Sequence, residues 1–292
     1  MKRLLNLSEE RAKVELDAVA SRHGLGLHAK VRVADVLPIE GSGVTSDLYR
    51  YALMAHFDFV VTDSDFDPRF AVEFDGPGHA APRAKALDAK KDALCQAFGL
   101  PLLRIKSSHL SKAYSDLSLL EWIIDVYHLQ RAFDDAQAGG SVPYDEPFDP
   151  FFIVADSMEA LSDPKARRFP YWISREAALS IQRLHKQGRV AQRSTSGLIG
   201  LDKEGNRRGI EYIRVNATHG ILVKSGMRAQ LFPVPLTDLL RELLLISVHD
   251  KLQRYLATGS GLMPIETIRR LHALYDARLA MLCCHSSSGP LK

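Results

Sequence analysis

The sequence has little cysteine and no long apolar run, and these absences exclude several classes of protein. Only three cysteines occur in 292 residues, Cys95 and the adjacent pair Cys283 and Cys284, which are too few for a disulfide framework or a four-ligand zinc site. No apolar stretch approaches membrane-spanning length, and the opening MKRLLNLSEERAKVEL becomes charged too early for a signal peptide. We therefore expect a protein of the reducing cytoplasm with no membrane partner.

Several short catalytic signatures are also missing. There is no Walker A sequence, no HExxH and no GxSxG, so the most easily recognised nucleotide-binding and hydrolase sites are not expected. The stretch DSDFD, residues 63–67, begins like a calcium-binding loop, but Pro68 occupies the position that requires glycine. Phe74 stands where such a loop needs its bidentate acid. These residues are therefore predicted to form a hairpin turn.

What is present is an ordinary globular composition with an uneven distribution of charge. The chain is 46% hydrophobic and 25% charged, with a net charge of +3. Residues 1–140 hold 17 lysines and arginines against 20 acids, whereas the remaining residues hold 21 against 15. An acidic part followed by a basic part suits a metal-binding centre beside a polyanion-binding surface, although basic faces are often merely solvated.

The length and the hydrophobic patterning predict two domains. The first, residues 1–137, is expected to be of the α/β class, and a linker rich in glycine and proline follows at 138–150. The second, residues 151–292, is expected to be basic and mostly helical with one β-hairpin at 197–215. The expected helices cover 8–22 (capped by Ser8), 83–98, 116–137, 174–188, 236–257 and 264–282, and the expected strands of the first domain cover 29–37, 56–63, 69–76 and 100–105.

Three carboxylates gather on the predicted hairpin of the first domain. Glu73 and Asp75 end its second strand on the same face, because side chains alternate along a strand. Antiparallel pairing brings Asp58 of the first strand alongside one of them. Converging carboxylates repel one another unless a cation lies between them, and Mg²⁺ binds one or two carboxylates together with water and phosphate. The pattern predicts a Mg²⁺ site with Asp58, Glu73 and Asp75 as ligands.

Basic side chains follow these acids. On the predicted helix 83–98, Asp88 and Lys91 are three residues apart and share a face, so Lys91 rather than Lys90 is expected to reach the carboxylates. His79 is expected either to accept a proton or hold a phosphate, or to be a polar turn residue. Arg104, at the end of a buried strand, is interpreted as a phosphate contact or as the ion-pair partner of an acid at the core edge.

Together these residues resemble a known family of nucleases. Asp58, Glu73-x-Asp75-Gly76, His79, Asp88-x-x-Lys91 and GLPLLRI are similar to the PD-(D/E)xK nuclease superfamily, over about residues 1–110. The strongest likeness is to a bacterial domain of unknown function related to very-short-patch repair endonucleases. The resemblance implies a restriction-endonuclease-like mixed sheet flanked by helices. It also implies an endonuclease that hydrolyses phosphodiester bonds in DNA with Mg²⁺, for which Mn²⁺ substitutes.

The resemblance also assigns roles to residues and leaves one question open. It implies catalytic roles for Asp58, Glu73, Asp75, Lys91 and His79, with Asp58 and Glu73 as the principal metal ligands and Asp75 either as a ligand or as the group that holds Lys91. It also makes Glu9 or Glu10 similar to the superfamily's helical acid; the alternative is a solvated acid of the first turn that the helix dipole favours. The superfamily's pattern has lysine two residues after the acid, where this chain has Asp75, and some branches move the lysine to the following helix. If no lysine reaches the carboxylates, the alternative is a nuclease fold that binds nucleic acid or mediates assembly without cutting it.

The basic second domain suggests a partner. Arg183 and Lys186 lie near the end of the helix 174–188, and Arg207 and Arg208 lie at the tip of the predicted hairpin. A helix followed by a basic-tipped hairpin suits a winged-helix-like DNA reader, and solvated surface charge is the alternative. The apolar stretch LTDLLRELLLISVHDKL also suits a homodimer formed through the C-terminal helices, which is compatible with either function.

Overall fold

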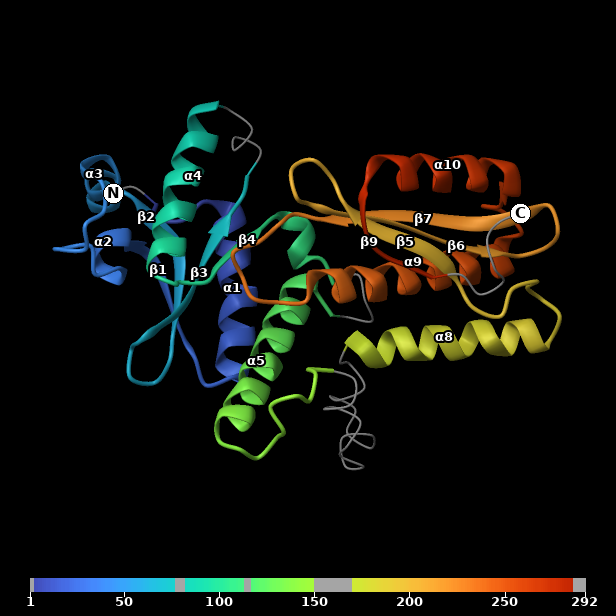
Figure 1. Ribbon diagram of the computed structural model, residues 1–292, viewed down its shortest axis with the longest axis horizontal. Coiled ribbons are helices and arrows are strands. Elements are labelled where there is room, and N and C mark those ends of the chain that lie inside the picture. The colour runs from blue at the N-terminus through green and yellow to red at the C-terminus, as the bar shows by residue number, and fades with distance from the viewer. Residues whose placement is uncertain (1–2, 77–81, 113–116, 150–169, 286–292) are drawn as a thin grey trace. The chain divides into compact units, whose positions relative to one another are not determined.

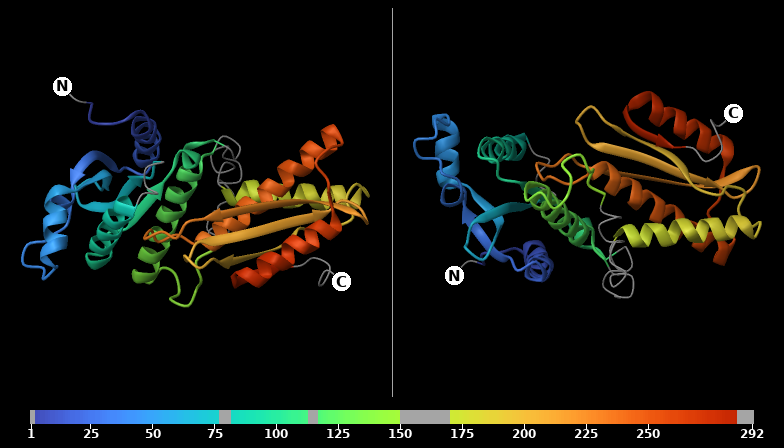
Figure 2. Two further views of the ribbon diagram at one scale, coloured as in Figure 1. Left: turned by 90° about the horizontal axis from the view of Figure 1, so that it is seen from above. Right: turned by 60° about the horizontal axis from the view of Figure 1, so that its bottom comes forward.

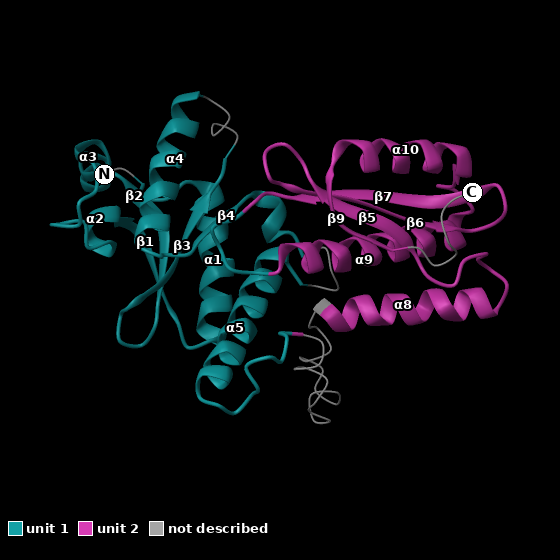
Figure 3. Cartoon of the chain, in the orientation of Figure 1, with its two compact units in different colours: residues 1–148, 230–234 teal, residues 149–229, 235–292 magenta. Residues whose placement is uncertain are grey.

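The chain forms two compact units that are interleaved along the sequence. The computed structural model describes residues 3–76, 82–112, 117–149 and 170–285 (Figure 1, with further views in Figure 2). Unit 1 comprises Met1–Phe148 and Gln230–Val234, and unit 2 comprises Asp149–Ala229 and Pro235–Lys292 (Figure 3). Residues 230–234, which the predicted second domain includes, thus return to unit 1. Within the described ranges, no helix is both long and apolar enough to cross a membrane.

Unit 1 is built on a mixed four-stranded sheet. Its strand order is β1-β2-β3-β4, with β1 to β3 antiparallel and β4 parallel to β3. The strands are β1 (Gly26–Arg32), β2 (His56–Thr62), β3 (Pro68–Phe74) and β4 (Leu102–Ile105). The predicted hairpin is confirmed: Asp63 Oδ1 accepts hydrogen bonds from the main-chain N–H groups of Asp65 and Asp67, which fixes the turn between β2 and β3.

Helices flank this sheet, and their starts and ends follow local chemistry. They are α1 (Leu7–Arg22), α2 (Val33–Val36), α3 (Ser46–Met54), α4 (Pro82–Ala97), the 3₁₀ helix η2 (Ser107–Leu110) and α5 (Leu119–Ala138). Asn6, not Ser8, caps α1, because Asn6 and Glu9 form a reciprocal capping box. The predicted strand 29–37 is wrong in its second part, since Val33–Val36 turns into helix α2.

The core of unit 1 includes a segment from far along the chain. Leu102 N–H donates to the carbonyl of Leu231, which adds a single antiparallel bridge at β4. Phe232 is buried, with its ring centroid 5.2 Å from that of Phe70 and 4.7 Å from that of Tyr127. The segment 230–234 therefore covers apolar side chains of β3 and α5 that would otherwise face water.

Unit 2 is a five-stranded antiparallel sheet with helices on both faces. The strand order is β8-β7-β6-β5-β9, and α10 lies over one face while α9 lies over the other, with α8 packed on α9 (Figures 1 and 2). Gly209 permits the close approach of α9, because a Cβ there would lie 2.6 Å from Leu244 Cδ1. The elements are α8 (Pro170–Lys186), β5 (Ser196–Leu201), β6 (Arg207–Arg214), β7 (His219–Met227), α9 (Leu236–Thr258), β8 (Met263–Pro264), α10 (Ile265–Arg278) and β9 (Ala280–His285).

This sheet corrects the expectation of a single hairpin in the second domain. The predicted hairpin is present as β5 and β6, but β7 and β9 flank it, so it is not a free wing. The predicted helix 264–282 ends at Arg278, and β9 follows. The apolar face of α9 is also used within the chain: Leu239, Leu240 and Leu244 are fully buried. These leucines are therefore not an exposed surface through which a homodimer could form.

Candidate metal centre

Asp58 and Glu73 meet where β2 and β3 separate. The ladder of main-chain hydrogen bonds between the two strands ends at the pair Phe59 and Val72. Beyond this pair, the carboxylates of Asp58 and Glu73 accept hydrogen bonds from main-chain N–H groups. Asp58 N–H donates to Glu73 Oε1 at 3.2 Å, and Phe74 N–H donates to Asp58 Oδ2 at 2.9 Å. The structure thus brings together two of the three predicted ligands, and main-chain amides orient both of them.

Lys91 of α4 completes an ion pair with Glu73. Its Nζ lies 2.7 Å from Glu73 Oε1 and 2.8 Å from the carbonyl oxygen of His56, and both side chains of the pair are less than one-tenth exposed. Lys90 instead lies 2.7 Å from Asp47 Oδ2 at the surface. The prediction that Lys91 rather than Lys90 reaches the carboxylates is therefore confirmed as a matter of geometry.

The surroundings of Glu73 make its negative charge costly. Burial raises the pKa of Glu73, the ammonium of Lys91 opposes this, and the nearby charge of Asp58 raises the pKa further. The net direction is upward. The carboxylate therefore gains from any additional positive charge brought close to it.

Asp75 belongs to a second ion-pair cluster, centred on Arg104. The guanidinium of Arg104 lies 3.3 Å from Asp75 Oδ1, 3.1 Å from Asp88 Oδ1 and 2.7 Å from Asp92 Oδ1. Burial alone would lower the pKa of Arg104, but these carboxylates outweigh it and raise the pKa. Of the two interpretations of Arg104, the ion-pair partner of acids at the core edge is the one observed.

Lys30 of β1 contacts Asp58 and links it to Glu9 of α1. Lys30 Nζ lies 2.6 Å from Asp58 Oδ1 and 3.1 Å from Glu9 Oε1. Glu9 uses its other oxygen to accept a hydrogen bond from Asn6 N–H in the capping box, so the acid serves the helix start and the cluster together. Glu10 forms an ion pair with Arg3. Of these two acids of α1, Glu9 is therefore the one that contacts Lys30, and through it the site.

Lys30 is the residue of this site that the sequence reading missed. It lies in a strand with an ordinary alternating pattern, and nothing in that pattern marks it as different from a surface lysine. What distinguishes Lys30 is its backbone conformation: its φ is +56°, in the left-handed region that residues other than glycine rarely adopt. Burial alone would lower the pKa of Lys30, but Asp58 and Glu9 raise it, so the ammonium stays charged.

The donor set suits a small divalent cation that binds oxygen. Within the described part of the chain, no group of three or more His, Cys, Asp or Glu side chains stands ready to hold a metal ion. However, Asp58 and Glu9 already share one cation, the Lys30 ammonium, and Glu73 adjoins Asp58. Mg²⁺ needs only one or two carboxylates beside water and phosphate, so these residues fit it. His79 lies outside the described residues.

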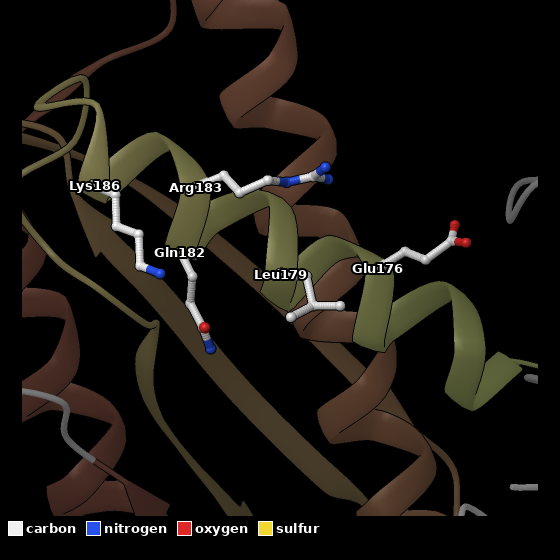
Figure 4. A pocket seen from close by; sticks show the side chains of 5 residues that line it. All are labelled: Glu176, Leu179, Gln182, Arg183 and Lys186. Atoms are coloured by element: carbon white, nitrogen blue, oxygen red, sulfur yellow. The ribbon is translucent and has the colours of Figure 1, made fainter.

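The basic residues predicted to contact DNA lie in two places in unit 2. Arg183 and Lys186 are exposed in the last turn of α8, where they line a pocket with Glu176, Leu179 and Gln182 (Figure 4). Arg207 and Arg208 begin β6 beside the tight turn at 202–206. Arg208 lies 2.8 Å from Asp202 Oδ2, and Arg207 donates to Thr237 Oγ1 at 3.3 Å. Part of this charge is thus engaged within the chain.

Comparison with known proteins finds a match for the N-terminal part of the chain. Residues 1–118 match a sequence family described as a protein of unknown function (DUF2726). The matched part contains α1, β1 to β4 and α4, and hence every residue of the cluster around Asp58 and Glu73. No curated protein and no solved structure shows a significant match to the chain. The family description assigns no activity, so the geometry of the cluster carries the functional argument.

Proposed function

We propose that this chain is a divalent-cation-dependent endonuclease that hydrolyses phosphodiester bonds in DNA, with its catalytic centre in unit 1. One observation carries the proposal. Asp58 and Glu73 meet at the ends of two neighbouring strands, and the ammonium of Lys91 lies 2.7 Å from Glu73. Two carboxylates can hold a divalent cation that activates water for phosphodiester hydrolysis, and a nearby lysine can neutralise charge on the phosphate.

The fold of unit 1 supports a restriction-endonuclease-like assignment. The resemblance implies a mixed sheet flanked by helices, and unit 1 has three antiparallel strands, a fourth parallel strand and helices before and after the hairpin. The acids lie on β2 and β3, and the lysine lies on the helix that follows β3. This arrangement is similar to that of the superfamily branches in which the lysine lies on the helix after the strand.

The proposed roles follow from the contacts. Asp58 and Glu73 would hold Mg²⁺ or Mn²⁺, and Asp75, tied to Arg104, would fix the end of β3 beside them. A bound divalent cation lowers the pKa of a water molecule and stabilises charge on a phosphoryl oxygen. Lys91 holds the Glu73 carboxylate in one orientation through its second bond to the carbonyl of His56. It also keeps a positive charge beside the acids when they are ionised.

Unit 2 would supply contacts to the DNA backbone. Arg183, Lys186 and Arg208 are exposed, and basic side chains bind phosphates without reading sequence. A chain that keeps the fold but only binds nucleic acid or mediates assembly is the second candidate. This non-catalytic role was expected if no lysine reached the carboxylates. The contact between Lys91 and Glu73 therefore argues against it.

Incubation with supercoiled plasmid and with single-stranded DNA tests the proposal. Nicking is expected with Mg²⁺ or Mn²⁺ and not with EDTA. Lys91→Ala should lose nicking, whereas Lys90→Ala, which removes a surface ammonium bound to Asp47, should retain it. Binding of DNA without cleavage under every metal condition would favour the non-catalytic alternative.

A further inference from the structure

Lys30 occupies the position between two carboxylates of the site. Its Nζ is 2.6 Å from Asp58 Oδ1 and 3.1 Å from Glu9 Oε1. The side chains of Asp58 and Glu9 are 16% and 12% exposed, and that of Lys30 is 30% exposed, so Lys30 is the most accessible of the three. Two nearby carboxylates would repel each other without this charge.

The backbone of β1 is bent into an unfavourable conformation at this residue. Ala29 pairs with Phe59 and Val31 with Phe57, so Lys30 lies level with Asp58, and its φ of +56° falls inside a continuing strand. A non-glycine residue adopts this conformation only where surrounding contacts hold it there. The ladder on both sides and the two carboxylates are those contacts.

Lys30 and Lys91 differ in their exposure and in the groups that hold their ammonium. The Lys91 side chain is 9% exposed and bonds both Glu73 and a main-chain carbonyl, so it is fixed within the protein. The Lys30 ammonium contacts the carboxylates of Asp58 and Glu9, and its side chain is 30% exposed. Of these two lysines, Lys30 is the one whose ammonium can move to a group arriving from solution.

The balance of charge in the cluster predicts when the Lys30 ammonium leaves Asp58. Glu9, Asp58 and Glu73 carry three negative charges against the two positive charges of Lys30 and Lys91. A divalent cation at Asp58 would reverse the balance and repel the ammonium beside it. A phosphodiester, with one negative charge, would then complement the displaced ammonium.

We propose that Lys30 is the resident cation of this metal position: a divalent cation displaces its ammonium from Asp58, and the freed ammonium binds a non-bridging oxygen of the substrate phosphate. The inference rests on the proposed nuclease function for its second step alone. The first step concerns only the protein and a metal ion. Because two cations compete for the same carboxylate, removal of the lysine must strengthen metal binding.

Calorimetric titration of the full chain with Mn²⁺ tests the exchange. Lys30→Met should bind Mn²⁺ about ten-fold more tightly than the wild type, the scale of one close charge contact in a partly solvated site. Lys90→Met is the matched control, since it removes a surface ammonium that also contacts an aspartate, and it should leave the affinity unchanged. Unchanged or weaker Mn²⁺ binding by Lys30→Met would overturn the proposal, because a lysine with only a structural role would not compete with the metal.

Plasmid cleavage at saturating Mn²⁺ tests the second step. Lys30→Met should cleave at least about ten-fold more slowly despite its tighter metal binding, whereas Lys30→Arg should recover part of the rate because it restores a phosphate donor. Cleavage by Lys30→Met at the wild-type rate would overturn the phosphate role. Absence of cleavage by the wild type would instead refute the nuclease function, and the Mn²⁺ titration would still decide the exchange.

Discussion

Glu73 and Lys91 form an ion pair in which Oε1 and Nζ are 2.7 Å apart and both side chains are less than one-tenth exposed. Breaking such a pair leaves one buried charge without its partner, which typically costs about 3–5 kcal/mol. Glu73→Gln should therefore lower the free energy of unfolding by roughly this amount, whereas Glu73→Gln combined with Lys91→Met should recover most of it. Urea denaturation measures both values. Equal stability of the single and the double variant would show that the pair is not effectively buried.

The segment 230–234 should matter to the stability of unit 1. Phe232 is buried against Phe70 and Tyr127, so Phe232→Ala should cost about 3–5 kcal/mol. Leu231 is the matched control: it is 40% exposed and contributes its main-chain carbonyl, so Leu231→Ala should cost less than about 1 kcal/mol. Fluorescence of Trp122, in a Trp172→Phe background, would report unfolding of unit 1. Similar losses for the two variants would contradict the assignment of this segment to the core.

Two histidines of unit 1 predict a loss of stability in acid. Burial lowers the pKa of His109 and of His128 to about 4, below the ordinary value of about 6.5. His109 Nδ1 accepts a hydrogen bond from Lys106 N–H, a bond that protonation of this nitrogen removes. Between these pH values the unfolded chain binds more protons than the native one, so stability should fall as pH is lowered from about 6.5 to about 4.

Thermal unfolding across this pH range checks the histidine prediction. His109→Gln and His128→Gln should each flatten the decline, because a neutral side chain cannot take up the proton. A decline that keeps its full slope in both buried variants would assign acid sensitivity to the carboxylates instead.

DNA binding by unit 2 predicts a change in salt dependence. Each basic side chain that neutralises a phosphate releases counterions and contributes roughly one unit to the log–log slope of affinity against salt. Replacing Arg207 and Arg208 by alanine should weaken binding to all sequences and reduce the slope by up to about two units. Arg270→Ala removes an exposed arginine of α10 and controls for net charge. An unchanged slope in the double variant would mean that the turn at 202–206 does not contact DNA.

Local patterns were sufficient to predict much of unit 1. The hairpin of β2 and β3, helix α4 and the phase that turns Lys91 toward the acids follow from alternation, turn residues and helical spacing. The prediction that Ser8 caps α1 was wrong. Asn6 and Ser8 are both good capping residues, and the capping box with Glu9 decides between them. The contact of Asp58 with Lys30 depends on one left-handed residue, which no spacing rule predicts.

Long-range pairing limited the prediction of unit 2. Strand β7 has a mixed polar and apolar sequence whose burial depends on α9 and β6, which lie on opposite sides of it in the chain. Strand β9 follows α10 directly, and its apolar residues Met281 and Leu282 continue the helical pattern of apolar residues. The segment becomes a strand because it pairs with the edge of β5, and the local pattern does not predict this pairing. The return of residues 230–234 to unit 1 likewise depends on a partner more than 120 residues away, Arg104, whose main chain bonds the Gln230 side chain.

The central claim, that Asp58 and Glu73 form one metal-dependent phosphodiesterase centre, is tested most directly by plasmid nicking in a double-variant cycle. Asp58→Asn, Glu73→Gln and the combined variant would be compared with the wild type in Mg²⁺, after circular dichroism has shown that each is folded. Groups that act as a unit are strongly non-additive, so each single variant should lose about a thousand-fold in rate, and the double variant should lose little more. Nicking at the wild-type rate by either single variant, or nicking that EDTA does not stop, would contradict the claim.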